Sequence, residues 1–464
     1  MFTALRPELA ELTRLLHQWH VDFVAGWWDD DALSRHQEDR LRATVEYVRE
    51  RSPFYREHLR GFADEPVERL PFTTKDDLRR AGFDLPARPV SDAWVFYETT
   101  GTTGAVVPCP RDNVDSLHNN TVLTVYYDAV FRRFGGNQVI GVCGPSELHA
   151  TGDTFGDVCR NLGLAVAKMW PHSPVVGFDR AVEVLRALPV TGLFCTPGMA
   201  LALVRAVRAA GLDPRRDLAV DVLMLTGELA SPSLLANIGG LWAAEAHNAL
   251  YASQEASVLG AVCADGTLRT APLINHYEVV DPATARLVRP DARGVRHGEL
   301  VVTNLYQGAK PLVRYRTGDL VRMYPARRGE VVPAPRLEVL GRTRDRIRLN
   351  GHVVTGYDLE DLLLDGVTGF LDYQVVLEHV AGEDRITLVL RDGPAPGDPA
   401  LRRVADRCRD ELSTGLEVVA GDPGAITGTG AMVSWKAARV VDRRESGVGD
   451  ETRAARLIAA RRTS

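Results

Sequence analysis

The fold of this chain is decided by the stretch Phe96-Tyr97-Glu98-Thr99-Thr100-Gly101-Thr102-Thr103-Gly104. It follows Trp94 and Val95, which together with Phe96 are typical of a β-strand. Glycine permits positive φ and lets backbone N–H groups converge, and threonine hydroxyls add neutral donors. A polyphosphate needs such groups, although a Thr/Gly cluster alone is also compatible with an ordinary turn. It is not a Walker A loop, because no Gly-Lys-Ser/Thr follows the second glycine.

Four further motifs follow along the chain, at residues 251–255 (YASQE), 315–320 (YRTGDL), 341–345 (GRTRD) and 435–439 (WKAAR). In this order they resemble the core motifs of the adenylate-forming superfamily of acyl- and aryl-CoA synthetases, luciferases and peptide-synthetase adenylation domains. Two earlier stretches, 51–55 (RSPFY) and 70–78 (LPFTTKDDL), resemble the N-terminal signature of phenylacetate–CoA ligases. The resemblance covers residues from about 50 to about 445.

Composition limits the class of protein. The 464 residues favour two or three domains, and 45% hydrophobic with 25% charged residues are typical of a globular protein. The net charge is −6, so the composition shows no excess of basic residues that would indicate a nucleic-acid-binding protein. The six cysteines show no Cys-x-x-Cys spacing, which argues against a zinc ribbon or a disulfide framework. Without a signal-like segment or a long apolar run, we expect a cytoplasmic protein with no membrane partner.

The hydrophobic pattern predicts an α/β protein. Residues 7–60 read as helices, because apolar side chains recur at helical spacing. From about 120 to 260, helical patterns alternate with strand-like runs, which indicates a largely parallel sheet covered on both faces. The runs lie at 139–142, 164–167, 192–195 and 220–225. From about 275 to 340, short β runs favour antiparallel pairing or a small barrel.

We expect a boundary near Gly341. Beyond it the pattern reads hairpin, helix, strand, strand, helix, strand, which is typical of a compact α+β unit. The predicted architecture is a large N-terminal adenylate-forming domain, residues 1–340, with parallel-type sheets, helices and a small β subdomain. A smaller, mobile α+β cap domain would then comprise residues 341–464.

The resemblance implies that a carboxylate attacks the α-phosphorus of ATP, giving an acyl-adenylate and pyrophosphate, after which a thiol takes the acyl group. It places the β- and γ-phosphates on Thr99, Thr100, Gly101, Thr102, Thr103 and Gly104. The family loop usually continues Gly-Lys-Pro, whereas this chain continues Gly-Ala-Val-Val-Pro at residues 104–108. The missing lysine removes one charge-assisted contact, for which Arg111 could substitute.

Carboxylates and an arginine are the next candidates. Glu255 follows a strand-like run, and a carboxylate there suits Mg²⁺, although a solvated loop glutamate would look the same. Asp319 follows Tyr-Arg-Thr-Gly; its alternative is a turn aspartate that bonds its own backbone. The resemblance implies that Glu255 binds the metal and acts in catalysis, and that Asp319 binds the ribose diol. It also assigns nucleotide contacts, to Tyr251 near the adenine, to Arg342, and to Gly227 and Glu228.

Lys436 occupies the place of the family's catalytic lysine, which bridges the carboxylate and the α-phosphate. Trp435 replaces the glycine that usually precedes it. A surface lysine in a basic C-terminal stretch is the alternative. Arg344 stands where the family has the hinge about which the small domain turns.

The loop at residues 144–155 is the expected wall of the acid pocket. It carries Glu147 and His149 where phenylacetate ligases tend to be apolar and aromatic. Because buried polar groups need partners, we hypothesise an acid that bears an amine or a hydroxyl. The alternative is that these side chains face solvent.

The sequence is therefore interpreted as an AMP-forming acid–thiol ligase that uses ATP, Mg²⁺ and coenzyme A on a small carboxylic acid. Two rivals stay open: transfer to a carrier-protein phosphopantetheine thiol or to an amine, and a nucleotide-binding protein with impaired catalysis. The resemblance also makes a homodimer plausible. A Rossmann dehydrogenase is disfavoured, because no Gly-x-Gly-x-x-Gly opens a helix after the first strand.

Overall fold

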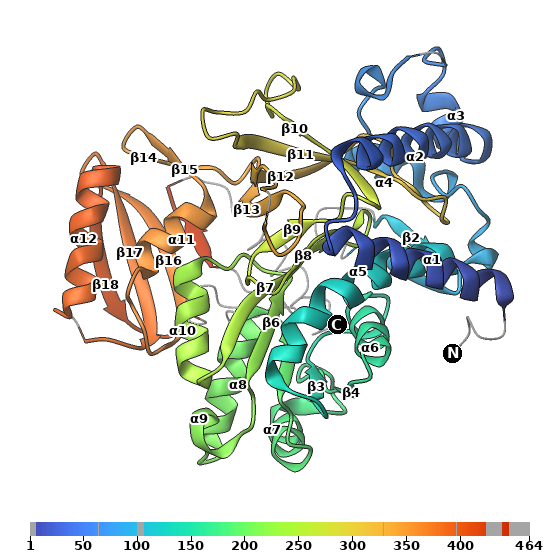
Figure 1. Cartoon of the computed structure of the whole chain (residues 1–464). Coiled ribbons are helices and arrows are strands. Elements are labelled where there is room, and N and C mark those ends of the chain that lie inside the picture. Colours follow the sequence, from blue (N-terminus) through green and yellow to red (C-terminus); the bar gives the residue numbers. More distant parts are fainter. Residues whose placement is uncertain are drawn as a thin grey trace.

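The computed structural model describes residues 6–63, 65–99, 106–327, 329–395, 397–423 and 439–444. Its central feature is an 11-stranded mixed sheet with the order β10-β11-β12-β13-β9-β8-β7-β6-β5-β3-β4. Helices cover this sheet, and a second, 4-stranded sheet forms a lobe at the left of Figure 1. The architecture is the α/β fold that the hydrophobic pattern predicts.

Helices and one hairpin make up the N-terminal part: α1 (Pro7–Val24), α2 (Asp30–Arg51), α3 (Pro53–His58), α4 (Lys75–Ala81), β1 (Val95–Glu98) and β2 (Pro108–Arg111). Ser52 lies between α2 and α3, and its side chain accepts from Tyr55 N and so caps the N-terminus of α3. Strands β1 and β2 pair antiparallel, with Glu98 opposite Pro108 and Val95 opposite Arg111. The predicted phosphate-binding stretch joins these two strands.

Five parallel strands form one half of the large sheet: β3 (Val139–Val142), β4 (Ala165–Lys168), β5 (Gly192–Cys195), β6 (Val222–Thr226) and β7 (Glu245–Ser253). The surrounding helices are α5 (Asn113–Phe131), α6 (Thr151–Asn161), α7 (Gly177–Ala187), α8 (Pro197–Ala209), α9 (Pro214–Asp217) and α10 (Pro232–Trp242). Strand residues alternate between two apolar clusters. Leu193 and Leu223 pack with α7, α8 and α10, whereas Phe194 and Met224 pack with α5 and α6. Both faces are therefore buried, as expected for parallel strands.

The other half of the sheet is antiparallel: β8 (Ser257–Val262), β9 (Leu268–Thr270), β10 (Asn275–Val280), β11 (Arg296–Asn304), β12 (Tyr315–Tyr324) and β13 (Arg336–Arg342). Its inner residues, such as Val279 and Leu300, pack against Val48 of α2, Tyr55 of α3 and Leu78 of α4. This packing places the N-terminus of α4 at the edge of the cavity described below.

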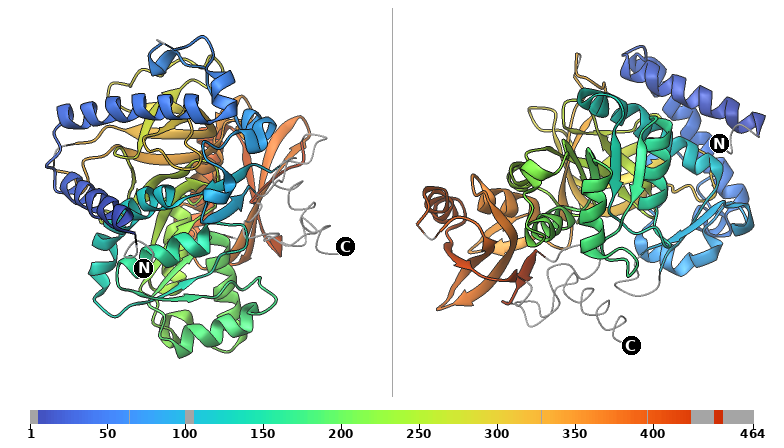
Figure 2. Two further views of the ribbon diagram at one scale, coloured as in Figure 1. Left: turned by 90° about the vertical axis from the view of Figure 1, so that its right-hand side faces the viewer. Right: turned by 90° about the horizontal axis from the view of Figure 1, so that it is seen from below.

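The C-terminal elements are β14 (Ile347–Leu349), β15 (His352–Val354), α11 (Gly356–Leu364), β16 (Phe370–Val380), β17 (Glu383–Asp392), α12 (Pro399–Leu412), β18 (Gly415–Ala420) and β19 (Val440–Asp442). Strand β13, the last strand of the large sheet along the chain, ends at Arg342, and β14 starts at Ile347. In the right-hand view of Figure 2 these elements lie to one side of the large sheet, opposite the N-terminal helices. One apolar cluster nevertheless includes Leu201 of α8 and Leu377 of β16, so the two parts share a packed contact. The division at residue 341 stays a prediction.

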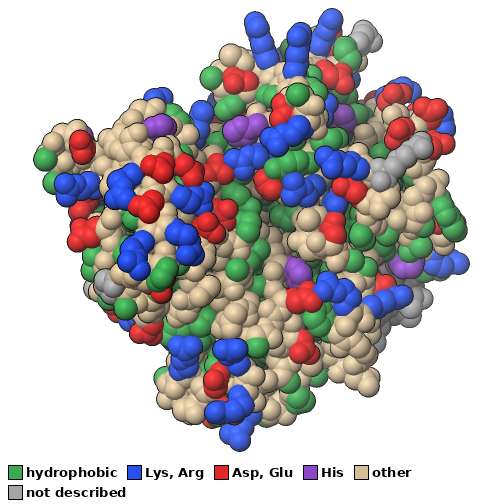
Figure 3. All heavy atoms as spheres, turned by 60° about the vertical axis from the view of Figure 1, so that its left-hand side comes forward, with side chains coloured by type: hydrophobic (Ala, Val, Ile, Leu, Met, Phe, Trp, Pro, Cys, Tyr) green, Lys and Arg blue, Asp and Glu red, His purple; other side chains and the backbone are tan. Residues whose placement is uncertain are grey.

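In the part of the chain that the structure describes, no helix combines the length and apolar character needed to span a bilayer. All six cysteines are buried and unpaired. On the face shown in Figure 3, basic and acidic side chains are interspersed.

Candidate active site

A cavity of about 1130 Å³ lies between the large sheet and the C-terminal elements. Its walls come from the carboxyl ends of β6 and β7, from β12 and β13, and from the start of α4 and α11. In α/β sheets, ligands bind at the carboxyl ends of parallel strands. The lining includes most of the predicted site residues that the structure describes: Thr99, His149, Gly227, Glu228, Tyr251, Glu255, Asp319, Arg342 and Arg344.

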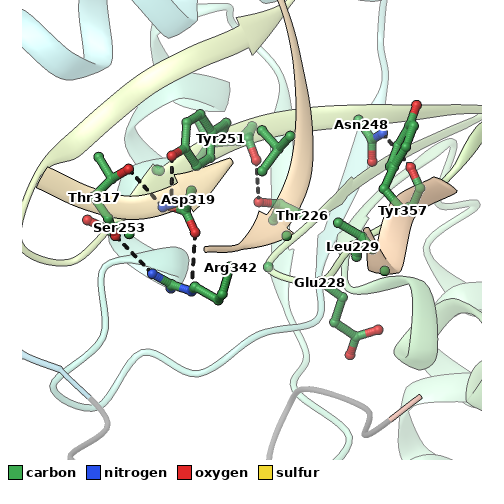
Figure 4. Close-up of a pocket in the computed structure, with 18 of the residues that line it drawn as sticks. Thr226, Glu228, Leu229, Asn248, Tyr251, Ser253, Thr317, Asp319, Arg342 and Tyr357 are labelled. Atoms are coloured by element: carbon green, nitrogen blue, oxygen red, sulfur yellow. Dashed lines mark hydrogen bonds and ion pairs between the residues drawn. The ribbon is translucent and has the colours of Figure 1, made fainter. Parts of the chain in front are cut away.

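Asp319 is held by groups from two other strands (Figure 4). Its Oδ2 accepts a hydrogen bond of 2.7 Å from the Tyr251 hydroxyl, and its Oδ1 lies 3.1 Å from Arg342 Nε. Arg342 also donates to the Thr317 carbonyl at 3.0 Å. These bonds fix the carboxylate at the cavity wall.

The register of the sheet explains this convergence. Asp319 of β12 pairs directly with Arg342 of β13, so the two side chains share one face. Gly318 has φ +74°, a conformation that favours glycine and turns the backbone just before the carboxylate. The Asp319 charge raises the pKa of Arg342 above its usual value, so this arginine stays charged. Burial, together with the Asp319 charge, raises the pKa of Tyr251, which keeps its hydroxyl proton for donation.

Glu255 is a buried carboxylate at the turn after β7. Its Oε1 lies 3.1 Å from Lys75 Nζ and accepts a bond of 2.9 Å from the Tyr315 hydroxyl. Burial alone would raise the pKa of Glu255, but the Lys75 ammonium and the hydrogen bonds lower it to about 2. Glu255 is therefore ionised at neutral pH, and it is not a solvated loop residue.

Sequence reasoning gave Lys75 no role of its own, although this residue is the ionic partner of Glu255. The position of Lys75 in the sequence could have indicated this role. Lys75 is the first residue of α4, directly after the Thr74 cap, where the helix dipole disfavours a cation. A lysine in that position points to an anionic partner outside the helix.

Gly227 and Glu228 line the cavity, but the Glu228 carboxylate is bound elsewhere. Its Oε2 accepts a bond of 3.0 Å from Gly198 N at the start of α8. Figure 4 shows this side chain directed away from Asp319. A helix N-terminus thus holds the Glu228 carboxylate in this structure, and its contact with the nucleotide stays a prediction.

The two predicted acid-pocket residues differ in their positions relative to the cavity. His149 lines the cavity, and its Nδ1 lies 2.8 Å from Thr151 Oγ1 and accepts from Thr151 N at 3.3 Å. In the neutral imidazole the ring proton is then on Nε2. Glu147 is exposed and does not line the cavity; its carboxylate accepts from the preceding Ser146 N at 3.3 Å. The structure therefore does not bring Glu147 to the cavity, and its role in the acid pocket stays a prediction.

Some predicted residues lie outside the described ones: Lys436 and the loop residues Thr100, Gly101, Thr102, Thr103 and Gly104. Thr99 is described and buried, and its hydroxyl accepts from Val107 N at 3.0 Å, which closes the base of the loop. Arg344 is exposed, lines the cavity and follows β13, where the large sheet ends. Its hinge role stays a prediction.

The residues of the cavity decide whether Mg²⁺ could bind there. Within the described residues, no group of three or more His, Cys, Asp and Glu side chains is placed to hold a metal. Mg²⁺ is usually bound through one or two carboxylates together with phosphate oxygens. The ionised, cavity-lining Glu255 supplies one such carboxylate, so these residues fit a metal that arrives with a nucleotide.

Comparison with known proteins finds chains that are similar over most of their length. The phenylacetate–coenzyme A ligase of Thermus thermophilus is 28% identical over 429 residues, which are 84% of this chain and 92% of that protein. The structure of 2-hydroxyisobutyryl-CoA ligase with 2-HIB-AMP, in the postadenylation state, gives a TM-score of 0.72 at 20% identity and covers 93% of this chain and 92% of its own. The acyl acid amido synthetase AtGH3.15 gives 0.64 at 15% identity and covers 96% of both chains. No family model matches the sequence.

These findings confirm the predicted resemblance to adenylate-forming ligases of the phenylacetate–CoA ligase type. The match with 2-hydroxyisobutyryl-CoA ligase extends over nearly the whole of both chains, so it includes the large sheet and the C-terminal elements. The fold is that of the adenylate-forming enzymes.

Proposed function

We propose that this chain is an AMP-forming acid–CoA ligase. It activates a carboxylic acid with ATP to an acyl-adenylate, releases pyrophosphate, and transfers the acyl group to coenzyme A. One observation carries this proposal: Asp319, oriented by Tyr251 and Arg342, shares a cavity with the ionised Glu255. A carboxylate for a ribose diol and a carboxylate for a metal–phosphate group suit a nucleoside triphosphate. The relatives with CoA-ligase names support the reaction class.

We assign the ribose diol to the Asp319 carboxylate. Each carboxylate has about four lone-pair sites. Tyr251 occupies one site on Oδ2, and Arg342 occupies one on Oδ1. The hydroxyls of a ribose would donate to this carboxylate, while Tyr251 and Arg342 keep it in a fixed orientation.

In the first step a carboxylate oxygen of the acid attacks the α-phosphorus of ATP. The bond from this phosphorus to the β-bridging oxygen breaks, and pyrophosphate leaves. In the second step the coenzyme A thiol attacks the acyl carbonyl, AMP leaves, and the thiol proton is released. Two anions meet in the first step, so fixed positive groups stabilise its transition state. We assign that task to Lys436, as the sequence predicts.

Glu255 would hold Mg²⁺ together with phosphate oxygens of the nucleotide. The metal would supply charge neutralisation there. Lys75 and the Tyr315 hydroxyl keep the carboxylate ionised and oriented toward the cavity. They prepare the ligand before the nucleotide binds.

For the acid we propose a substrate that bears a hydroxyl or an amine. His149 and Thr154 present polar groups to the cavity beside the apolar Phe155, which suits an organic acid of mixed character. The acyl acceptor could be a carrier-protein thiol or an amine in place of coenzyme A. The homodimer and the cytoplasmic location stay predictions.

The test measures pyrophosphate release from ATP in the presence of each member of a panel of aromatic, hydroxy and amino acids, with and without coenzyme A. We expect release that needs both the acid and ATP, and thiol consumption when coenzyme A is present. Lys436→Ala and Asp319→Ala should each lower the rate by about a hundredfold or more. Binding of ATP without acid-dependent release would favour a catalytically impaired nucleotide-binding protein. Turnover that occurs only with a carrier protein or an amine would show that this group, and not coenzyme A, is the acceptor.

A further inference from the structure

Arg111 is a buried arginine in the wall of the active-site cavity. It is the last residue of β2 and exposes 8% of its surface. One of its terminal nitrogens donates to the Gln254 carbonyl at 3.3 Å, and the guanidinium carbon lies 5.4 Å from the centroid of the Tyr97 ring. Within the described residues, no carboxylate lies at ion-pair distance. A guanidinium has five N–H donors, so donors remain for a ligand.

The other buried arginines are compensated differently. Arg269 pairs with Asp265 at 2.5 Å and with Glu330 at 2.6 Å. Arg314 binds both oxygens of Glu278, at 3.0 Å and 2.6 Å. A buried charge is costly unless a partner compensates it. The described residues around Arg111 supply a carbonyl, an aromatic face and the more distant charge of Asp115 but no ion pair, which leaves room for direct compensation from the cavity side.

The neighbourhood of Arg111 is rich in positive charge. Gln254 and Glu255 form the turn after β7, and three cations contact this turn. Lys75 binds the Glu255 carboxylate, Lys310 donates to the Glu255 carbonyl at 2.7 Å, and Arg111 donates to the Gln254 carbonyl. Glu255 provides one negative charge, and the buried Asp115 carboxylate of α5 also interacts with the Arg111 charge, so three cations face two carboxylates. Such an excess of positive charge in a low-dielectric wall favours an anion.

We propose that Arg111 binds an oxyanion of a reactant in this cavity. The planar guanidinium is suited to bidentate binding of a phosphate or a carboxylate. The oxyanion belongs either to the polyphosphate of the nucleotide or to the carboxylate of the acid, and this choice of ligands rests on the proposed function. Thr99, at the base of the predicted phosphate loop, lines the same cavity.

The test compares the wild type with Arg111→Gln and Arg111→Lys by calorimetric titration with three probes: ATP with Mg²⁺, inorganic pyrophosphate, and phenylacetate. Arg40→Gln is the matched control, because Arg40 lies over the Trp19 ring at 5.3 Å and does not line the cavity. We expect Arg111→Gln to weaken binding of at least one probe by about ten- to a hundredfold. Arg111→Lys should restore part of that loss, and Arg40→Gln should bind like the wild type.

Each outcome decides a point. Loss for ATP and pyrophosphate assigns Arg111 to the polyphosphate, and loss for phenylacetate alone assigns it to the acid. Unchanged affinity for all three probes in Arg111→Gln, or in Arg111→Lys if the glutamine variant does not fold, overturns the proposal. A wild type that binds none of them contradicts it as well. Because these are binding measurements, they stand apart from acid-dependent pyrophosphate release, on which the proposed function depends.

Discussion

Tyr251 donates a hydrogen bond of 2.7 Å to Asp319 across 68 residues of sequence. The bond joins β7 of the parallel half of the sheet to β12 of the antiparallel half. Arg342 of β13 holds the other oxygen of the same carboxylate. Three strands therefore set the orientation of the group that we assign to the ribose.

Substitution of Tyr251 by Phe should raise the KM for ATP by about tenfold, because the carboxylate loses one charge-assisted hydrogen bond. Steady-state kinetics with saturating acid measure this. Tyr324→Phe is a matched control, since its hydroxyl also bonds a carboxylate, Glu338 at 2.8 Å, but Tyr324 does not line the cavity. Equal ATP dependence in the two variants would argue against a nucleotide role for Asp319.

Glu255→Gln should lower kcat/KM by about ten- to a hundredfold, because it removes the ionised cavity carboxylate and leaves Lys75 without its ionic partner. Pyrophosphate release at several Mg²⁺ concentrations measures the effect. We expect the variant to need more Mg²⁺ than the wild type. An unchanged Mg²⁺ dependence would contradict the metal role.

The stability of the fold should depend on pH through the same residue. The pKa of Glu255 in the folded protein is about 2, below the ordinary value of 4.5. Its contribution is therefore fully present above about pH 4.5 and is lost as the pH falls toward 2. In urea titrations, the difference in unfolding free energy between wild type and Glu255→Gln should be constant near neutral pH and shrink below pH 4.5. A difference that grows on acidification would show that the carboxylate is not stabilised by Lys75.

The fold could be predicted from the sequence to a large extent. Strands such as Val139–Val142 and Gly192–Cys195 are short apolar runs between helical patterns, and their burial on both faces follows from that pattern. Asp319 and Arg342 were predicted through intact motifs. Their contact depends on the register of β12 and β13, which those motifs alone do not state.

Other features of the site depend on contacts between distant segments. Lys75 meets Glu255 only because α4 packs on the antiparallel half of the sheet, and no local pattern encodes this meeting. Glu228 follows a strand as expected, but the N-terminus of α8 lies close enough to hold its carboxylate. Glu147 sits in a polar loop, where the sequence pattern does not show which side chains turn outward.

His149→Phe should change the choice of acid. The imidazole presents a polar group to the cavity, and a phenyl ring would remove the partner of a substrate hydroxyl or amine. We expect the ratio of kcat/KM for phenylacetate over its hydroxy- or amino-substituted analogues to rise by about tenfold. Glu147→Gln, an exposed neighbour, should leave the ratio unchanged. A wild type that already prefers plain phenylacetate would refute the polar-substrate hypothesis.

Asp372→Asn should loosen the contact between the C-terminal elements and the large sheet. Asp372 of β16 lies 3.3 Å from Arg205 of α8 and also binds Arg439 before β19. Removing its charge leaves two arginines without a buried carboxylate, and we expect a loss of about 3 to 5 kcal/mol in unfolding free energy. Glu378→Gln removes the exposed pair with Arg443 and should cost less than about 1 kcal/mol. Similar losses in the two variants would refute the buried contact.

The most direct measurement is mass spectrometry of the mixture that forms from ATP, Mg²⁺ and an acid library without coenzyme A. If the cavity at Asp319 and Glu255 joins AMP to a carboxylate, one acid should yield a product with the mass of acid plus AMP minus water. Addition of coenzyme A should convert this product to a thioester. An enzyme that binds ATP but yields no acyl-adenylate with any acid would contradict the proposed reaction.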